Sequence, residues 1–158
     1  MTGFGQDGPY ANRGGYDFLA QGMGGLMSVT GEADGPPLKV GVAMADLATG
    51  MYATVSILAA LRHAERTGEG QQIDISLLDT QIAMLANQAS SYLVGGVVPG
   101  RMGNRHPTVV PYTTFEVTDG TVIIAIGNDG QFRAFCTEMG VAELGTDPRF
   151  AAASSRVV

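Results

Sequence analysis

The sequence has little cysteine, little charge and no long apolar run, and each shortage excludes a class of protein. The single cysteine, Cys136, excludes an internal disulfide framework and is typical of a reducing compartment. The net charge of −6 argues against general nucleic-acid binding, which needs a basic face. No uninterrupted apolar run reaches the roughly 18 residues of a membrane span, and no basic-then-apolar leader opens the chain. We therefore expect a soluble, cytoplasmic protein that binds neither nucleic acid nor membrane.

Metal-binding residues are also scarce. Two histidines and one cysteine do not form a zinc pattern, and we interpret the eight methionines as core filler rather than metal ligands. The 158 residues are 45% hydrophobic, which is enough to bury the core of one ordinary domain. We expect a folded protein without a bound metal.

The two ends of the chain look unlike those of a complete protein. The chain opens in turn residues, TGFGQDGPY, and stops within 149–158, where a new helix could begin. We expect a fragment of a longer chain. A small domain with frayed ends is the alternative.

The first part of the chain predicts helices around one strand. Periodic apolar residues and small residues predict helices over Tyr16–Val29, Asp46–Arg66 and Leu77–Val94. Alternation of Ile73 and Ile75 with polar residues predicts a strand over Gln71–Ser76. This order indicates an α/β fold with a parallel sheet, here a partial Rossmann-like large domain covering residues 1–94.

The second part has a different character. A long loop over residues 95–111 is expected to be a linker or an active-site loop. Two runs, Tyr112–Val117 and Thr121–Ile126, are joined through Asp119-Gly120, which is a good hairpin signal. A helix capped by Asn128 or Asp129 should then run to Met139 and stop at Gly140. Residues 112–158 therefore read as the start of a smaller α+β domain.

Asp46 is the leading candidate for chemistry. It lies in the stretch VGVAMADLATGMY, where small and apolar residues lead up to one carboxylate and an apolar helical pattern follows. The simple interpretation is a helix N-cap, because aspartate is a preferred capping residue. The other is a nucleophile, because a helix start keeps a carboxylate ionised and such a carboxylate can attack an activated acyl group. Spacing alone does not choose between the two.

Seven stretches, taken in order along nearly the whole chain, resemble the central part of the family III CoA-transferases. They are GFGQDGPY, GGYDFLAQGMGGLMSVTGEADGPP, VGVAMADLATGMYA, RTGEGQQIDISLLD, RMGNRHPTVVPY, IAIGNDGQF and DPRF. The resemblance implies transfer of CoA from an acyl-CoA donor to a carboxylic acid, with no tightly bound cofactor. It also implies that Asp46 attacks the donor thioester and forms first an aspartyl–acyl anhydride and then an aspartyl–CoA thioester.

The resemblance assigns further pocket residues. Tyr16 stands where related acyl-CoA racemases have the histidine of a histidine–aspartate pair; tyrosine is a poor base at neutral pH, which favours transfer over racemisation. We expect Tyr16 to line the pocket or to form a hydrogen bond with the acyl group, although it could simply be an aromatic anchor at a helix start. The neighbouring Asp17 could cap that same helix. Arg13 could meet a CoA phosphate or be a solvated loop arginine, and Gln21 could face the site or pack inside. The further candidates lie in a loop that matches the one covering the family's active site: Gly103, Asn104 and His106. A lone loop histidine is more often structural, so His106 is not assigned as a base.

The family also implies what surrounds this chain. Its nucleotide-binding N-terminal half, which holds most CoA contacts, is not represented here, so we expect the fragment to be inactive alone. Family members form interlocked homodimers. Two other functions stay open: a racemase or hydratase-type relative acting on acyl-CoA, and a truncated domain whose only activity is association.

Overall fold

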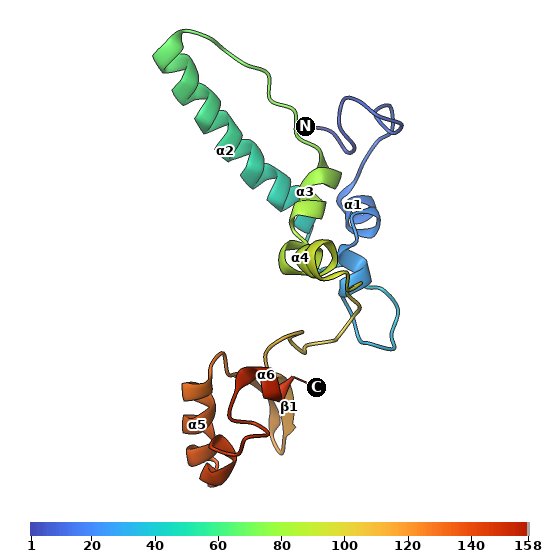
Figure 1. Ribbon diagram of the computed structural model, residues 1–158. Helices are drawn as coiled ribbons and strands as arrows, with labels where there is room; N and C mark the ends of the chain where they lie inside the picture. The colour runs from blue at the N-terminus through green and yellow to red at the C-terminus, as the bar shows by residue number, and fades with distance from the viewer. Residues whose placement is uncertain (158) are drawn as a thin grey trace. The chain divides into compact units, whose positions relative to one another are not determined.

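The computed structural model describes residues 1–157 and divides the chain into two compact units. The first unit is Met1–Arg101 and the second is Met102–Val158, so the division falls inside the segment predicted to be a linker. Figure 1 traces both along the chain. The elements of the first unit are α1 (Asp17–Met23), the 3-10 turn η1 (Leu26–Val29), α2 (Met44–Thr67), α3 (Leu77–Ala83) and α4 (Ala86–Gly95).

Helix α2 is the longest element and confirms the strongest helix prediction (Figure 1). It begins two residues before the predicted start and ends where Gly68, at φ 79°, adopts the left-handed conformation that closes many helices. Its buried face is narrow and consists of the small residues Ala45, Ala48 and Thr49, all in the first two turns. This end of α2 packs against α1 and α3, and small side chains allow the close approach.

The larger apolar residues of α2 lie on its exposed surface. Leu47, Met51, Val55 and Leu58 are each 58–67% exposed, so the stripe that predicted the helix is not covered within the described residues. The methionines do not fill the core as expected: Met23, Met51 and Met139 are about half exposed or more.

Helix α2 also has the length and apolarity of a membrane span, although its apolar residues form no uninterrupted run of that length. Its most apolar 18-residue window has a mean hydropathy of 1.4, and 17% of that window is buried. A core helix of a soluble protein meets the same criterion, so this property alone assigns no environment.

Two predicted helices are each broken in two. The segment predicted as Tyr16–Val29 forms α1 and η1 because Gly25 adopts φ 88°, which a helix cannot include. A Cβ on Gly24 would lie 2.7 Å from the carbonyl oxygen of Ala20 in α1 and 2.8 Å from Cγ of Gln81 in α3, so neither helix leaves room for a side chain there. The segment predicted as Leu77–Val94 breaks between α3 and α4, where Ala86 has φ 45°.

The expected parallel sheet is wrong for residues 1–157. The predicted strand Gln71–Ser76 has no strand beside it there, and its parallel pairing is one bridge between Thr2 and Ser76. The amide of Thr2 donates to the carbonyl of Ile75, and the amide of Leu77 donates to the carbonyl of Thr2. A parallel sheet needs at least two full strands, and within the described residues only a single bridge at Thr2 pairs with the segment Gln71–Ser76. The Rossmann-like architecture therefore remains a prediction.

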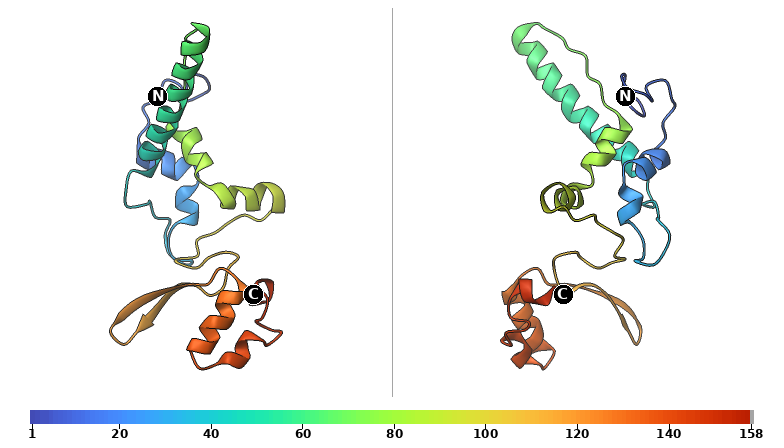
Figure 2. Two further views of the ribbon diagram at one scale, coloured as in Figure 1. Left: turned by 90° about the vertical axis from the view of Figure 1, so that its left-hand side faces the viewer. Right: turned by 45° about the vertical axis from the view of Figure 1, so that its right-hand side comes forward.

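The second unit contains the predicted hairpin. Strand β1 (Tyr112–Val117) pairs antiparallel with β2 (Gly120–Ala125), with Tyr112 opposite Ala125 and Val117 opposite Gly120, which confirms the Asp-Gly turn signal (Figure 2). Helix α5 (Asp129–Glu138) follows; Asn128 caps it by accepting from the amide of Gln131 at 2.9 Å. The 3-10 turn η2 (Ala142–Gly145) and the short α6 (Ala153–Arg156) complete the unit. The core of this unit is formed by Ile126, Phe132 and Cys136.

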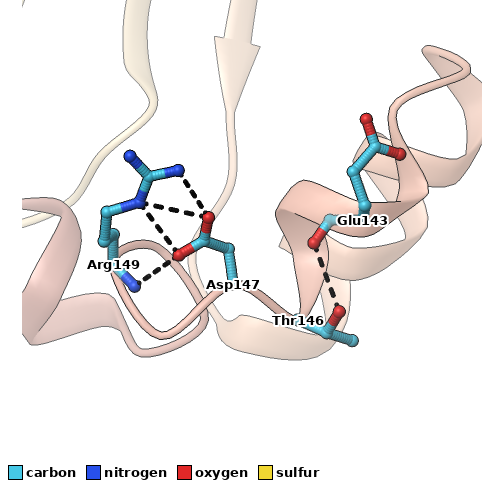
Figure 3. A network of polar contacts seen from close by, with 4 residues as sticks. All are labelled: Glu143, Thr146, Asp147 and Arg149. Atoms are coloured by element: carbon cyan, nitrogen blue, oxygen red, sulfur yellow. Dashed lines mark hydrogen bonds and ion pairs between the residues drawn. The ribbon is translucent and has the colours of Figure 1, made fainter.

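Two polar groups tie down the end of the second unit. The guanidinium of Arg156, almost fully buried, donates to the carbonyls of Val110 and Phe150 and to Asp129, and lies 4.4 Å from the ring centre of Phe132. In the turn before α6, Asp147 accepts from both the side chain and the amide of Arg149 (Figure 3). These bonds lower the pKa of Asp147, the side-chain bond more than the backbone bond.

Candidate active site at the start of helix α2

The structure places Asp46 in the first turn of α2, but not at the capping position predicted as the simple alternative. The helix begins at Met44, with Ala43 at the N-cap, so Asp46 is the third helical residue. Asp46 is exposed, and its carboxylate makes no hydrogen bond or ion pair within residues 1–157. The dipole at a helix N-terminus favours a negative charge at this position. Asp46 is therefore an accessible carboxylate with no structural contact of its own here.

The capping role belongs to Asp17, which the sequence assigned to its own helix instead. Asp17 is the first residue of α1, and its Oδ1 accepts a hydrogen bond of 2.7 Å from the amide of Ala45 in α2. Its other oxygen, Oδ2, accepts from Nε2 of Gln21 at 2.8 Å. No local pattern could reveal this bond, because the two residues are 28 positions apart. Asp17 thus fixes the turn that carries Asp46.

The other first-turn amides of α2 can be accounted for one by one. Met44 donates to the carbonyl of Val42 at 2.8 Å, and Leu47 donates to the carbonyl of Ala43 at 3.0 Å. Ala45 donates to Asp17. Among the described residues, the amide of Asp46 is the first-turn donor left without an acceptor, and free amides at a helix start attract anions.

Gln21 lies behind this turn rather than on its surface. It is completely buried. Its Oε1 accepts from the amide of Val40 at 2.9 Å, while Nε2 donates to Asp17 and, at 3.4 Å, to the carbonyl of Val42. All of its polar atoms are used to hold the approach segment to α1. Of the two sequence interpretations, the geometry supports packing inside.

Tyr16 and Arg13 are both on the surface of the first unit. Tyr16 is 76% exposed and directly precedes Asp17, as Ala45 directly precedes Asp46. The bond between Asp17 and Ala45 therefore brings the backbone of Tyr16 and Asp46 to the same end of α2. Arg13 is exposed and stacks its guanidinium 4.3 Å from the ring centre of Tyr10, which holds a cation in the N-terminal loop.

The three loop candidates lie in the second unit. Gly103 adopts φ 59°, and the side-chain amide of Asn104 donates to the hydroxyl of Thr114 at 3.3 Å. His106 packs its ring 5.1 Å from that of Tyr112 and lines a cavity of the second unit. Within residues 1–157, no three His, Cys, Asp or Glu side chains are placed to hold a metal ion.

Comparison with known proteins now places the chain. All of residues 1–158 match the family described as CoA-transferase family III. The chain is 54% identical over 157 residues to the succinate–glutarate CoA-transferase of Agrobacterium fabrum, covering 99% of this chain and 39% of that protein. It is 43% identical over 150 residues to the acetyl-CoA:oxalate CoA-transferase of Acetobacter aceti, covering 94% and 39%.

A solved structure gives the same result. The CAIB/BAIF family protein from Brucella suis superposes with a TM-score of 0.79 and 55% identity, covering 99% of this chain and 41% of that one. The chain therefore belongs to CoA-transferase family III, as the sequence resemblance indicated. It spans about two fifths of the length of these relatives.

Proposed function

We propose that the complete natural protein containing these residues transfers CoA from an acyl-CoA donor to a carboxylic acid, with Asp46 as the nucleophile. The observation that carries the proposal is the division of labour between two carboxylates at one helix start. Asp17 uses both oxygens to cap α2 and to bind Gln21, while the carboxylate of Asp46 is exposed and makes no hydrogen bond or ion pair within the described residues. A nucleophile must be accessible to its substrate, and the exposed Asp46 meets this condition.

The proposed reaction is a series of acyl transfers and needs no oxidant or reductant. The Asp46 carboxylate attacks the donor thioester, and the CoA thiolate leaves as an aspartyl–acyl anhydride forms. The thiolate then attacks the aspartyl carbonyl, which releases the donor acid and leaves an aspartyl–CoA thioester. The acceptor carboxylate attacks this thioester, expelling the thiolate and forming a second anhydride. Attack of the thiolate on the acceptor acyl carbon gives the product and restores the carboxylate.

The start of α2 supports this chemistry electrostatically. Each addition places negative charge on a carbonyl oxygen, and amide donors that face such an oxygen lower the barrier. The amide of Asp46 is without an acceptor in the described residues, and the helix dipole adds partial positive charge at the same place. We propose that the pocket is completed by Tyr16, whose exposed hydroxyl can donate to the acyl oxygen.

The racemase alternative finds no support in the geometry. Racemisation needs a base near the α-carbon, and the phenol of a tyrosine is a poor base at neutral pH. The named relatives are transferases as well. Their names point to short dicarboxylic acids as acceptors, and we propose the same class here, with CoA thioesters as substrates rather than as bound cofactors.

Partners and location stay proposals drawn from the family and from composition. We propose an interlocked homodimer, and the uncovered apolar stripe of α2 supports burial of that surface in an assembly. The net charge of −6 and a single buried cysteine support a cytoplasmic protein.

Trapping of the acyl-enzyme tests the nucleophile directly. The complete natural protein is incubated with succinyl-CoA and hydroxylamine, digested, and mapped by mass spectrometry. A hydroxamate on Asp46 is expected, because hydroxylamine captures both the anhydride and the thioester. Asp46→Asn should abolish the adduct and lower kcat by about a thousandfold or more, since a nucleophile is removed.

Asp34→Asn is the matched control, because Asp34 is an exposed carboxylate of the same unit. It should leave both the adduct and the turnover unchanged. An adduct on another residue, or normal turnover in the Asp46 variant, would overturn the assignment. Exchange of the substrate α-proton in deuterated water without an adduct would indicate racemisation instead.

A further inference from the structure

The C-terminal end of α2 carries a basic surface hollow that the proposed chemistry at Asp46 does not use. The hollow has a volume of about 450 Å³ and is lined by Ala59, Arg62, His63, Arg66 and Thr67. Residues 59, 62, 63 and 66 follow the spacing that places side chains on one face of a helix. Three basic side chains therefore surround the small side chain of Ala59 in the last turns of α2.

The charge of this hollow is opposite to that of the whole protein. The chain carries a net charge of −6, yet no Asp or Glu lines the hollow. Arg62, His63 and Arg66 are exposed, and within residues 1–157 their side chains form no hydrogen bond or ion pair. Glu65 and Glu69, the acidic residues nearest in sequence, neither line the hollow nor pair with its cations there. The described part of the chain therefore leaves this positive charge without a counter-charge.

The spacing of the cations favours an anion between them. Arg62 and Arg66 are one turn apart on the same face, and like charges at this spacing repel each other. The helix dipole favours a cation at the C-terminal end of α2, but it does not remove the repulsion between two of them. An anion placed between the two guanidiniums does remove it. His63 is three residues before Arg66, so its ring is a neighbour on the same face and can donate to the same anion.

The hollow is separate from the nucleophile. An α-helix rises about 1.5 Å per residue, so Arg66 lies about 30 Å from Asp46 along the axis of α2. Figures 1 and 2 show this end of α2 extending away from α1 and α3, which pack against its start. An anion held at Arg66 cannot contact a thioester at Asp46, so the site does not depend on the proposed function.

We propose that this hollow binds the phosphate group of a phosphate ester, with Arg62 and Arg66 holding it from two sides and His63 donating a further hydrogen bond. A guanidinium matches the oxygens of a phosphate bidentately, and such charged bonds are the stronger kind of hydrogen bond. A phosphate monoester has three acceptor oxygens and close to two negative charges, whereas a carboxylate has two oxygens and one charge. Three basic groups around one hollow therefore fit a phosphate better than a carboxylate.

The test measures binding of inorganic pyrophosphate to the complete natural protein by calorimetry, with chloride keeping the ionic strength constant. Saturable binding is expected. The double variant Arg62→Gln/Arg66→Gln should weaken it roughly tenfold or more, and His63→Gln should weaken it by a smaller factor. Arg133→Gln is the matched control; it removes the same charge from an exposed position of α5 outside the hollow and should leave the affinity unchanged. Equal thermal unfolding midpoints without ligand show that all variants keep the fold.

The outcomes separate this proposal from the nucleophile assignment. Asp46→Asn should bind pyrophosphate normally even though it transfers no CoA. Absence of saturable binding, or an affinity that the double arginine variant leaves unchanged, would overturn the phosphate site and leave the role of Asp46 standing. Equal loss of affinity in the double variant and in Arg133→Gln would overturn it too, because the attraction would then be unspecific. Succinate binding as tightly as pyrophosphate through the same arginines would overturn the choice of phosphate.

Vesicles identify the source of the phosphate group. The complete natural protein is sedimented with phosphatidylcholine vesicles that contain phosphatidic acid. Cosedimentation that the double variant loses would assign the phosphate to a lipid headgroup. Pyrophosphate binding without cosedimentation would assign it to a soluble ester.

Discussion

The carboxylate of Asp17 accepts a 2.7 Å hydrogen bond from the amide of Ala45, the residue directly before Asp46. One helix is thereby capped by the first residue of another, and the capping charge is separate from the charge that remains free. Had Asp46 capped its own helix, its lone pairs would be engaged in structure. At the start of α2, Asp17 from α1 thus stabilises the helix, and the carboxylate of Asp46 remains available for chemistry.

Removal of the Asp17 carboxylate should loosen the start of α2. We expect Asp17→Ala to cost about 0.5–2 kcal/mol, the usual value of a lost N-cap, and to raise the hydrogen-exchange rate of the Ala45 amide. In the complete natural protein, CoA transfer should fall as well, because Asp46 loses its fixed position. Exchange followed by NMR checks the first effect, and steady-state kinetics the second.

The control for this experiment is Asp34→Ala, which removes an exposed carboxylate from the loop before α2. It should change neither the exchange of Ala45 nor turnover. If Asp17→Ala left the Ala45 amide as protected as before, the cap would not be the interaction that orders this turn.

Two buried glutamines of the first unit should respond oppositely to the same substitution. Gln21 and Gln81 are both completely buried, but the amide of Gln21 has protein partners whereas neither polar atom of Gln81 has one in the described residues. Gln21→Met leaves Oδ2 of Asp17 and the Val40 amide without their partner, so we expect a loss of about 1–3 kcal/mol. Gln81→Met removes an unpaired amide from the interior and should be neutral or stabilising.

Chemical denaturation of the two variants under one set of conditions measures the difference. Each serves as the control for the other, because the change in side-chain volume and chemistry is identical. A similar loss in both variants would mean that packing, and not hydrogen bonding, determines the stability of this interior.

Local features of this fold could be predicted from the sequence because each depends on neighbouring residues. The hairpin followed from Asp119-Gly120 between two apolar runs, and the start of α5 followed from Asn128. The long helix followed from its apolar period, although that period marked a surface left exposed within residues 1–157. In each case the local sequence pattern predicted the helix or strand but not the residues that pack against it.

The features that failed depend on distant contacts. A parallel sheet was expected from Gln71–Ser76, yet a strand forms only where a partner strand lies beside it. The close approach of Gly24 to Gln81, a residue from α3, lies beside the break that Gly25 makes between α1 and η1, and the sequence of α1 alone does not show it. The same reasoning explains the candidate site: Asp46 was singled out from its own stretch, whereas the role of Asp17 depended on a bond to a helix 28 residues away.

The turn before α6 gives a prediction about acid. Asp147 accepts hydrogen bonds from the side chain and then the amide of Arg149, and these lower the pKa of its carboxyl (Figure 3). Because the pKa is lowered in the folded state, this contact contributes stability above the ordinary carboxyl pKa, and the contribution is lost as the pH falls through the lowered value. We expect the titration of Asp147, followed by NMR, to have its midpoint below that of an unperturbed aspartate.

Arg149→Gln should move that midpoint back up, since the guanidinium is the largest cause of the lowered pKa, and leave the smaller effect of the backbone amide. Arg133→Gln is the matched control and should leave the midpoint in place, because Arg133 makes no ion pair with Asp147. A midpoint that stayed low in Arg149→Gln would show that the turn's backbone, and not the guanidinium, sets the acidity of Asp147.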